Sequence, residues 1–122
     1  MSHTFTDRVF ALVDKRDATA FAALFAPHGR FVFGNAEPIC GPAAIAEAVQ
    51  AFFDGIRGLR HTIVNRWEVA PATAAELSVE YHRLDGEYVT VPAVTIFDRG
   101  AGTGQITSYR IFVDLAPLFA VR

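Results

Sequence analysis

The sequence lacks the features that mark several large classes of protein. It has one cysteine, Cys40, in 122 residues, which excludes an intrachain disulfide. Its 11 lysines and arginines form no basic stripe, so we expect no nucleic-acid partner. The 11 phenylalanines form no apolar run long enough to span a bilayer, so we expect no membrane partner either.

Signals for metal binding and secretion are also missing. The histidines His3, His28, His61 and His82 are scattered without the spacing of metal ligands, so we expect no metal and no cofactor. Residues 1–7 do not combine a basic region with a following apolar stretch, as a secretory signal would. Together with the single cysteine, this predicts a cytoplasmic protein.

What the chain does have is apolar content. Hydrophobic residues make up 52% of the sequence, which is enough for one core, and no linker or repeat interrupts it. We therefore expect a single domain over residues 1–122. Apolar surface in so small a protein is expected to be hidden in an interface, in a pocket, or in both.

The patterning predicts helices first and a sheet afterwards. Apolar residues recur at helical spacing from Phe5 to Val13, Asp17 suits the N-cap of a second helix, and Pro42 opens a third that ends at Gly55. Strand-like composition covers residues 30–34, 60–68, 75–84, 88–97 and 105–114. The glycine-rich segment 100–104 precedes a strand rather than a helix, which favours a hairpin loop over a phosphate site. The fold class is therefore α+β with a mostly antiparallel sheet.

Alternation along the strands selects candidate pocket residues. His61, Asn65 and Trp67 share the more apolar face of their strand, and Tyr81 lies on the apolar face of the next. Buried polar groups need partners, so these side chains either bond neighbouring backbone or line a ligand cavity. The sequence leaves both interpretations open.

The last two strands raise the question of a partner subunit. Residues 88–97 are apolar on both faces, and a second copy of the chain is the simplest cover for the outer one, which predicts a homodimer. Residues 109–114 alternate between an apolar set and a polar set. Alternation alone would send Arg110 and Asp114 to solvent. If instead Tyr109, Ile111 and Val113 cover the dimer interface, then Arg110, Phe112 and Asp114 face the cavity, and the sequence leaves both orientations open.

The order of several short motifs resembles the SnoaL-like family of the nuclear-transport-factor-2-like superfamily. The motifs are Leu24-Phe25-Ala26, Phe31-Val32-Phe33-Gly34-Asn35, Gly41-Pro42-Ala43-Ala44-Ile45, residues 60–65, residues 81–86, Val91-Pro92-Ala93 and residues 110–114. The resemblance implies a cone-shaped α+β barrel, with a curved sheet wrapped around N-terminal helices, an internal apolar pocket and usually a homodimer. Asp114 matches the last-strand aspartate that the family's cyclases use as acid and base.

Two functions follow from the resemblance and the candidate residues. The first is a cofactor-independent isomerase, cyclase or dehydratase acting on a small apolar carbonyl or polyketide-like substrate. Asp114 would transfer the proton, and His61 and Tyr81 would donate hydrogen bonds to the developing enolate. The second is a non-catalytic dimeric module that binds an apolar ligand or a protein. The predicted ligand-binding residues are Asn65, Arg110, Phe33, Trp67 and Phe112.

Overall fold

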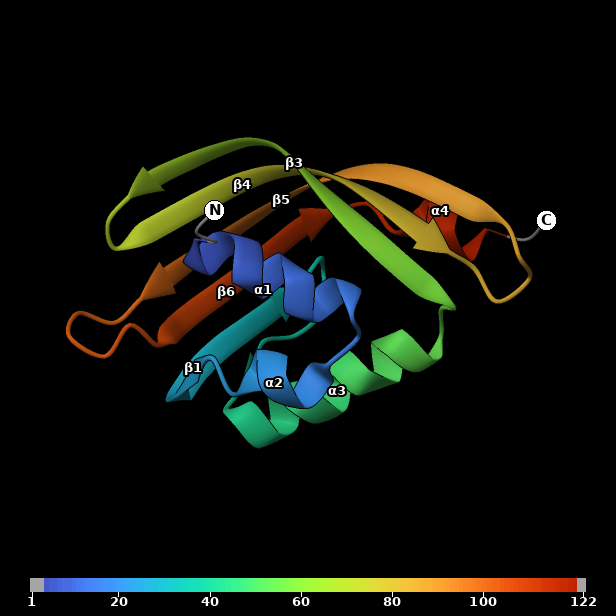
Figure 1. The fold of residues 1–122 in the computed structure, drawn as a ribbon. Coiled ribbons are helices and arrows are strands. Elements are labelled where there is room, and N and C mark those ends of the chain that lie inside the picture. The colour runs from blue at the N-terminus through green and yellow to red at the C-terminus, as the bar shows by residue number, and fades with distance from the viewer. Residues whose placement is uncertain (1–3, 121–122) are drawn as a thin grey trace.

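The computed structural model describes residues 4–120, in which a curved sheet wraps around three helices (Figure 1). The helices are α1 (Phe5–Asp14), α2 (Ala18–Ala22), α3 (Pro42–Asp54) and the short α4 (Ala116–Phe119). The strands are β1 (Phe25–Phe33), β2 (Ile39–Cys40), β3 (Gly58–Val69), β4 (Ala72–His82), β5 (Tyr88–Arg99) and β6 (Ile106–Val113). The α+β prediction is confirmed.

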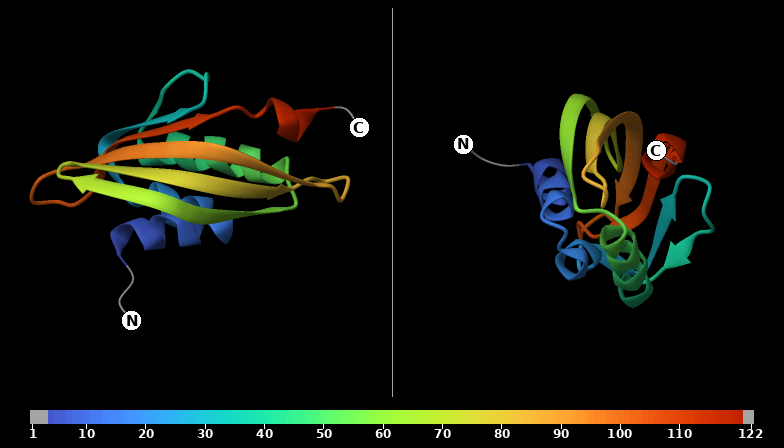
Figure 2. Two further views of the ribbon diagram at one scale, coloured as in Figure 1. Left: turned by 90° about the horizontal axis from the view of Figure 1, so that it is seen from above. Right: turned by 90° about the vertical axis from the view of Figure 1, so that its right-hand side faces the viewer.

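The six strands form one open sheet in the order β2-β1-β6-β5-β4-β3. Strands β1 and β6 run parallel, and all other neighbours run antiparallel. Figure 2 shows α1, α2 and α3 on the concave side of the sheet, which gives the molecule its cone shape. Between residues 4 and 120, no helix is both long and apolar enough to cross a bilayer.

A capping box starts α1. The Thr4 hydroxyl accepts the Asp7 backbone N–H at 3.1 Å, and the Asp7 carboxylate accepts the Thr4 backbone N–H at 3.2 Å. Arg66 on β3 donates to the same carboxylate at 2.8 Å and thus connects the helix start to the sheet. The hydrogen bond from Arg66, helped by Thr4, holds the pKa of the Asp7 carboxyl below its ordinary value.

Replacing Asp7 with asparagine is expected to lower the free energy of unfolding by about 1 kcal/mol near neutral pH. Because the folded-state pKa is depressed, the stabilisation is present above the ordinary carboxyl pKa and is lost as pH falls through the folded value. Urea denaturation at several pH values measures this, and Glu37→Gln on an exposed turn is the matched control. An equal loss at neutral and at strongly acidic pH would contradict the assignment.

Both other core helices begin where the sequence predicts, and α3 also ends there, whereas α2 already ends at Ala22. The Asp17 carboxylate caps α2 by accepting the Ala20 N–H at 3.0 Å, and α3 has Pro42 in its first turn and Gly55 at its C-cap. The apolar stripe of α3 is buried against the sheet at Ile45 and Phe53. Strand β1 starts at Phe25 rather than at residue 30, because Phe25 already pairs with Ile106 on β6. The register between the two strands then shifts between Phe25 and Arg30.

A register shift in β3 changes which side chains face inward. His61 and Ile63 pair with Val79 and Leu77, but the next pairs are Asn65 with Glu76 and Trp67 with Ala74. Val64 is therefore an extra residue, and a bulge of this kind reverses the alternation beyond it. His61 and Ile63 stay on the concave side, whereas Asn65 and Trp67 turn outward.

Strand β6 has the orientation opposite to the one needed for an inward Asp114. Tyr109 is buried and Ile111 and Val113 are half-buried on the concave side, while Arg110, Phe112 and Asp114 are exposed. The prediction that Tyr109, Ile111 and Val113 form the outer face is thus wrong. The apolar set faces inward because the helices of the same chain already supply an apolar surface for it to bury.

Candidate active site

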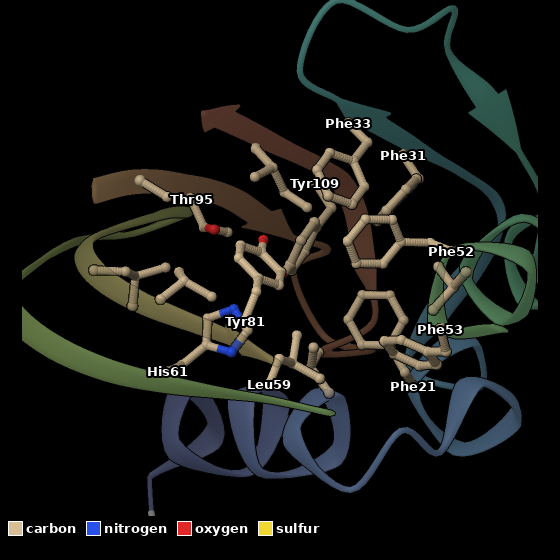
Figure 3. Close-up of a pocket in the computed structure, with 16 residues that line it drawn as sticks. Phe21, Phe31, Phe33, Phe52, Phe53, Leu59, His61, Tyr81, Thr95 and Tyr109 are labelled. Carbon is tan, nitrogen blue, oxygen red and sulfur yellow. The ribbon is translucent and has the colours of Figure 1, made fainter. Parts of the chain in front are cut away.

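The concave side of the sheet encloses an aromatic cavity between the sheet and helix α3 (Figure 3). The volume that the centre of a water molecule can reach is about 40 Å³. This is space for about three water-sized groups. The aromatic residues that line it are Phe21, Phe31, Phe33, Phe52, Phe53, Tyr81 and Tyr109.

One histidine enters this aromatic lining, and an aspartate fixes its ring. His61 lines the cavity, and its Nδ1 lies 2.7 Å from the Asp14 Oδ1 at the end of α1. The Asp14 carboxylate also accepts the His61 backbone N–H, with 3.1 Å to each oxygen. Phe10 stacks on the imidazole with ring centroids 5.1 Å apart. The backbone bonds, the side-chain bond and the stacking together hold the ring in one orientation.

The contact with Asp14 determines what the imidazole can do in the cavity. A carboxylate oxygen can only accept a hydrogen bond, so Nδ1 is the donor of this pair. In the neutral ring the proton therefore sits on Nδ1, and Nε2 is left as an acceptor. A base held in this way can take a proton from a bound molecule.

Tyr81 supplies the complementary donor. It lies diagonally across from His61, because His61 pairs with Val79 and Tyr81 is two residues further along β4. Figure 3 shows the two side chains next to each other in the cavity. Burial raises the pKa of Tyr81 to about 12, so the phenol keeps its proton at neutral pH. Its hydroxyl can donate a hydrogen bond to an oxygen atom of a ligand.

A second buried phenol belongs to the core as well as to the lining. Tyr109 is fully buried, and burial raises the pKa of its phenol while a hydrogen bond with Thr95 acts in the opposite direction. Its ring stacks on Phe31 and Phe97 with centroids 5.7 Å and 5.9 Å away, and Phe21 meets it edge-on. Tyr109 and Thr95 thus add a second fixed polar group to the wall of the cavity.

The structure brings together three of the predicted site residues. His61, Tyr81 and Phe33 all line the cavity, from β3, β4 and β1. Of the two interpretations left open for His61 and Tyr81, the structure favours the one in which they line a cavity.

The other predicted site residues lie outside the cavity. Asn65 is exposed and donates to the Glu76 carboxylate at 2.8 Å, and Trp67 is exposed beyond the same bulge. Arg110 and Phe112 contact each other on the outer face. The Asp114 carboxylate is exposed and accepts the Ala116 N–H at 3.0 Å, which makes it a cap for the turn before α4. The inward orientation predicted for Asp114 is therefore wrong.

Sequence reasoning missed Asp14 and Thr95. Asp14 is separated from His61 by 47 positions, and no local pattern links an acid at a helix end to a distant strand. Thr95 could have been found, because it is the polar member of the inward series Val91, Ala93, Thr95 and Phe97.

The charges around the cavity limit the ligands it can take. Within residues 4–120, no arginine or lysine lines the cavity, so an anionic group would have no charged partner there. In that same range, no group of three or more histidine, cysteine, aspartate or glutamate side chains could hold a metal ion. Among the described lining residues, the usable groups are the imidazole of His61, hydroxyl groups and aromatic rings.

A curved sheet around three helices, with a cavity in its concavity, defines the nuclear-transport-factor-2-like class of α+β proteins. The sequence profile of the SnoaL-like domain matches residues 6–109, and the chain belongs to this family. A comparison with curated proteins gives no match.

Solved structures show the same fold at low sequence identity. A hypothetical protein with a ketosteroid isomerase-like fold from Catenulispora acidiphila DSM 44928, in complex with trimethylamine, has a TM-score of 0.86 and 18% identity over 98% of this chain and 92% of that one. An NTF2-like protein of unknown function from Burkholderia pseudomallei K96243 has a TM-score of 0.82 and 13% identity over 93% and 90%. The epoxide hydrolase/cyclase-like enzyme SalBIII has a TM-score of 0.77 and 18% identity over 91% and 88%.

Proposed function

We propose that the protein is a cofactor-independent enzyme that moves a proton on a small carbonyl compound. The observation that carries the proposal is the pair of His61 and Asp14, whose imidazole lines the same aromatic cavity as Tyr81. His61 takes the role of base in place of Asp114, whose carboxylate is exposed. The SalBIII structure supports acid–base chemistry on this fold by analogy alone.

The chemical step needs these groups and no others. Nε2 of His61 removes a proton from the carbon next to the carbonyl, and the electron pair of the C–H bond forms the enolate. The charge develops on the carbonyl oxygen, where the hydrogen bond from Tyr81 strengthens. The imidazolium, stabilised by Asp14, then protonates the enolate. Returning the proton to another carbon completes an isomerisation, whereas an exchange is completed when the Nε2 proton is first replaced by one from solvent and that proton is delivered to the same carbon.

Hydrogen–deuterium exchange tests this proposal directly. The protein is mixed with acetone or butanone in D₂O, and loss of the α-proton signal is followed by NMR. These are among the smallest ketones that carry an α-proton, whereas a polyketide-sized substrate would require the aromatic side chains to move far apart. Exchange no faster than in buffer containing an unrelated protein would contradict the proposal.

Binding of a small amine without chemistry is the second candidate. The observation that favours it is the lining itself, since aromatic faces without a nearby cation attract alkylated ammonium groups. The Catenulispora structure with trimethylamine is consistent with a ligand of this size on this fold.

We also propose that the protein is a homodimer that uses the outer face of the sheet. On that face Val94 pairs with Phe112, and Ile96 pairs with Arg110. Ile96 also pairs with Ala74, which pairs with Trp67, so Trp67 lies in the same row as Ile96 and Arg110. The side chains of Trp67 and Phe112 are 53% and 52% exposed, which is unusual for large aromatic residues lying in one patch. A second copy of the chain, with the same patch, would bury both.

Replacing Phe112 with glutamate is expected to convert the dimer to a monomer, because an unpaired charge in a dry interface costs several kcal/mol. Light scattering coupled to size exclusion measures the mass at micromolar concentration. Ala51→Glu, on the exposed side of α3, is the control and should leave the dimer intact. A monomeric unmodified protein would refute the proposed interface.

A further inference from the structure

The cavity combines aromatic faces with a single acceptor nitrogen that has a negative charge behind it. The rings of Phe52 and Phe33 lie 4.9 Å apart, Phe52 meets Tyr81 edge-on at 6.0 Å, and all three residues line the same small space. His61 lines that space, and its other ring nitrogen contacts the Asp14 carboxylate. The aromatic rings, the acceptor nitrogen and the carboxylate behind it all favour a positive charge inside.

A positive charge in such a cavity would be stabilised in two separate ways. The π faces attract it from several sides. In addition, an N–H proton on the cation can be donated to Nε2 of His61, which gives a charge-assisted hydrogen bond. The Asp14 carboxylate makes the imidazole a stronger acceptor by holding the Nδ1 proton, as the second partner of a histidine generally does. A quaternary ammonium ion has no N–H and can use the faces alone.

We infer that the cavity selects small protonated amines over quaternary ammonium ions and over neutral molecules of equal size. Recognition runs through the N–H of the amine and Nε2 of His61, and Asp14 is the positioning residue that orients and polarises the imidazole. The inference rests on the proposed function in one respect, namely that the same cavity admits a small ligand. It makes such amines competitive inhibitors of any proton transfer at His61.

Calorimetric titration near neutral pH tests the selectivity with three probes: trimethylammonium chloride, tetramethylammonium chloride and tert-butanol. Trimethylammonium is expected to bind about tenfold more tightly than either of the others. Asp14→Asn should weaken trimethylammonium by about tenfold and leave tert-butanol unchanged. Asp17→Asn removes an equal charge three residues away, keeps a competent helix cap, and should change nothing.

Phe52→Leu is a second variant in case Asp14→Asn fails to fold. It replaces a half-buried ring with an aliphatic side chain and should weaken both ammonium ions several-fold relative to tert-butanol. Equal or tighter binding of tetramethylammonium would overturn the inference, as would equal losses for all three probes in Asp14→Asn. Ketone exchange without amine binding would overturn this inference and leave the proposed function standing. Amine binding without ketone exchange would leave this inference standing and overturn the proposed function.

Discussion

Replacing His61 with asparagine is expected to slow α-proton exchange of a small ketone by about 10²- to 10⁴-fold, the usual contribution of one general base. Asparagine keeps a polar side chain of similar length but offers no nitrogen that can accept a proton. The backbone N–H that Asp14 binds is retained, so the connection between α1 and β3 survives in part. The loss should therefore appear in kcat, measured by NMR in D₂O, while circular dichroism shows a folded protein.

His82→Asn is the matched control for this experiment. His82 lies on the other face of the sheet, where its ring contacts Glu80 at 2.9 Å and stacks on Tyr88. Removing this imidazole should leave exchange unchanged, since it does not line the cavity. Full activity in His61→Asn would eliminate His61 as the base and would direct attention to a different proton acceptor.

Replacing Tyr109 with alanine is expected to lower the free energy of unfolding by about 3–5 kcal/mol, as for other large buried aromatic side chains. The phenol ring lies among Phe21, Phe31 and Phe97, and its removal leaves a void that these packed rings cannot fill. Urea denaturation measures the loss through the shift of the midpoint.

Two further variants separate packing from hydrogen bonding at this position. Tyr109→Phe keeps the ring and removes the bond with Thr95, so a loss of about 1 kcal/mol is expected. Tyr88→Ala removes an exposed tyrosine from the outer face and should cost little. If Tyr109→Ala were no more harmful than Tyr88→Ala, the inward orientation of β6 would be wrong.

The order and type of the longer elements could be predicted from sequence because their signals are local, whereas the short β2 and α4 were not predicted. Asp17, Pro42 and Gly55 act within one helical turn, and strand composition is a property of consecutive residues. The face of each strand is a different matter. A bulge at Val64 reverses the alternation of inward and outward side chains along β3, and the residue types around Val64 do not predict the extra position. Asn65 and Trp67 were misplaced for this reason.

Which face of β6 is buried could not be decided from its own residues. Its alternation is clear, but either face could be the buried one until the helices are placed on the concave side. The competing explanation, a partner subunit over the apolar set, relied on a surface outside the chain. Burial within the chain needs no partner, and Asp114 consequently points away from the cavity. The contact between Asp14 and His61 is likewise a product of tertiary structure.

The parallel pairing of β1 with β6 has a consequence for the order of folding. Cavity residues on β1 pair directly with cavity residues on β6: Phe31 with Tyr109, and Phe33 with Ile111. During synthesis β1 therefore cannot pair with β6 until β6 has left the ribosome. Until then, the aromatic rings of the first half lack the β6 residues against which they pack. Contacts between such distant segments form slowly, and the incomplete chain exposes apolar surface in the meantime. The cavity of this protein is therefore expected to be among the last parts of the molecule to fold.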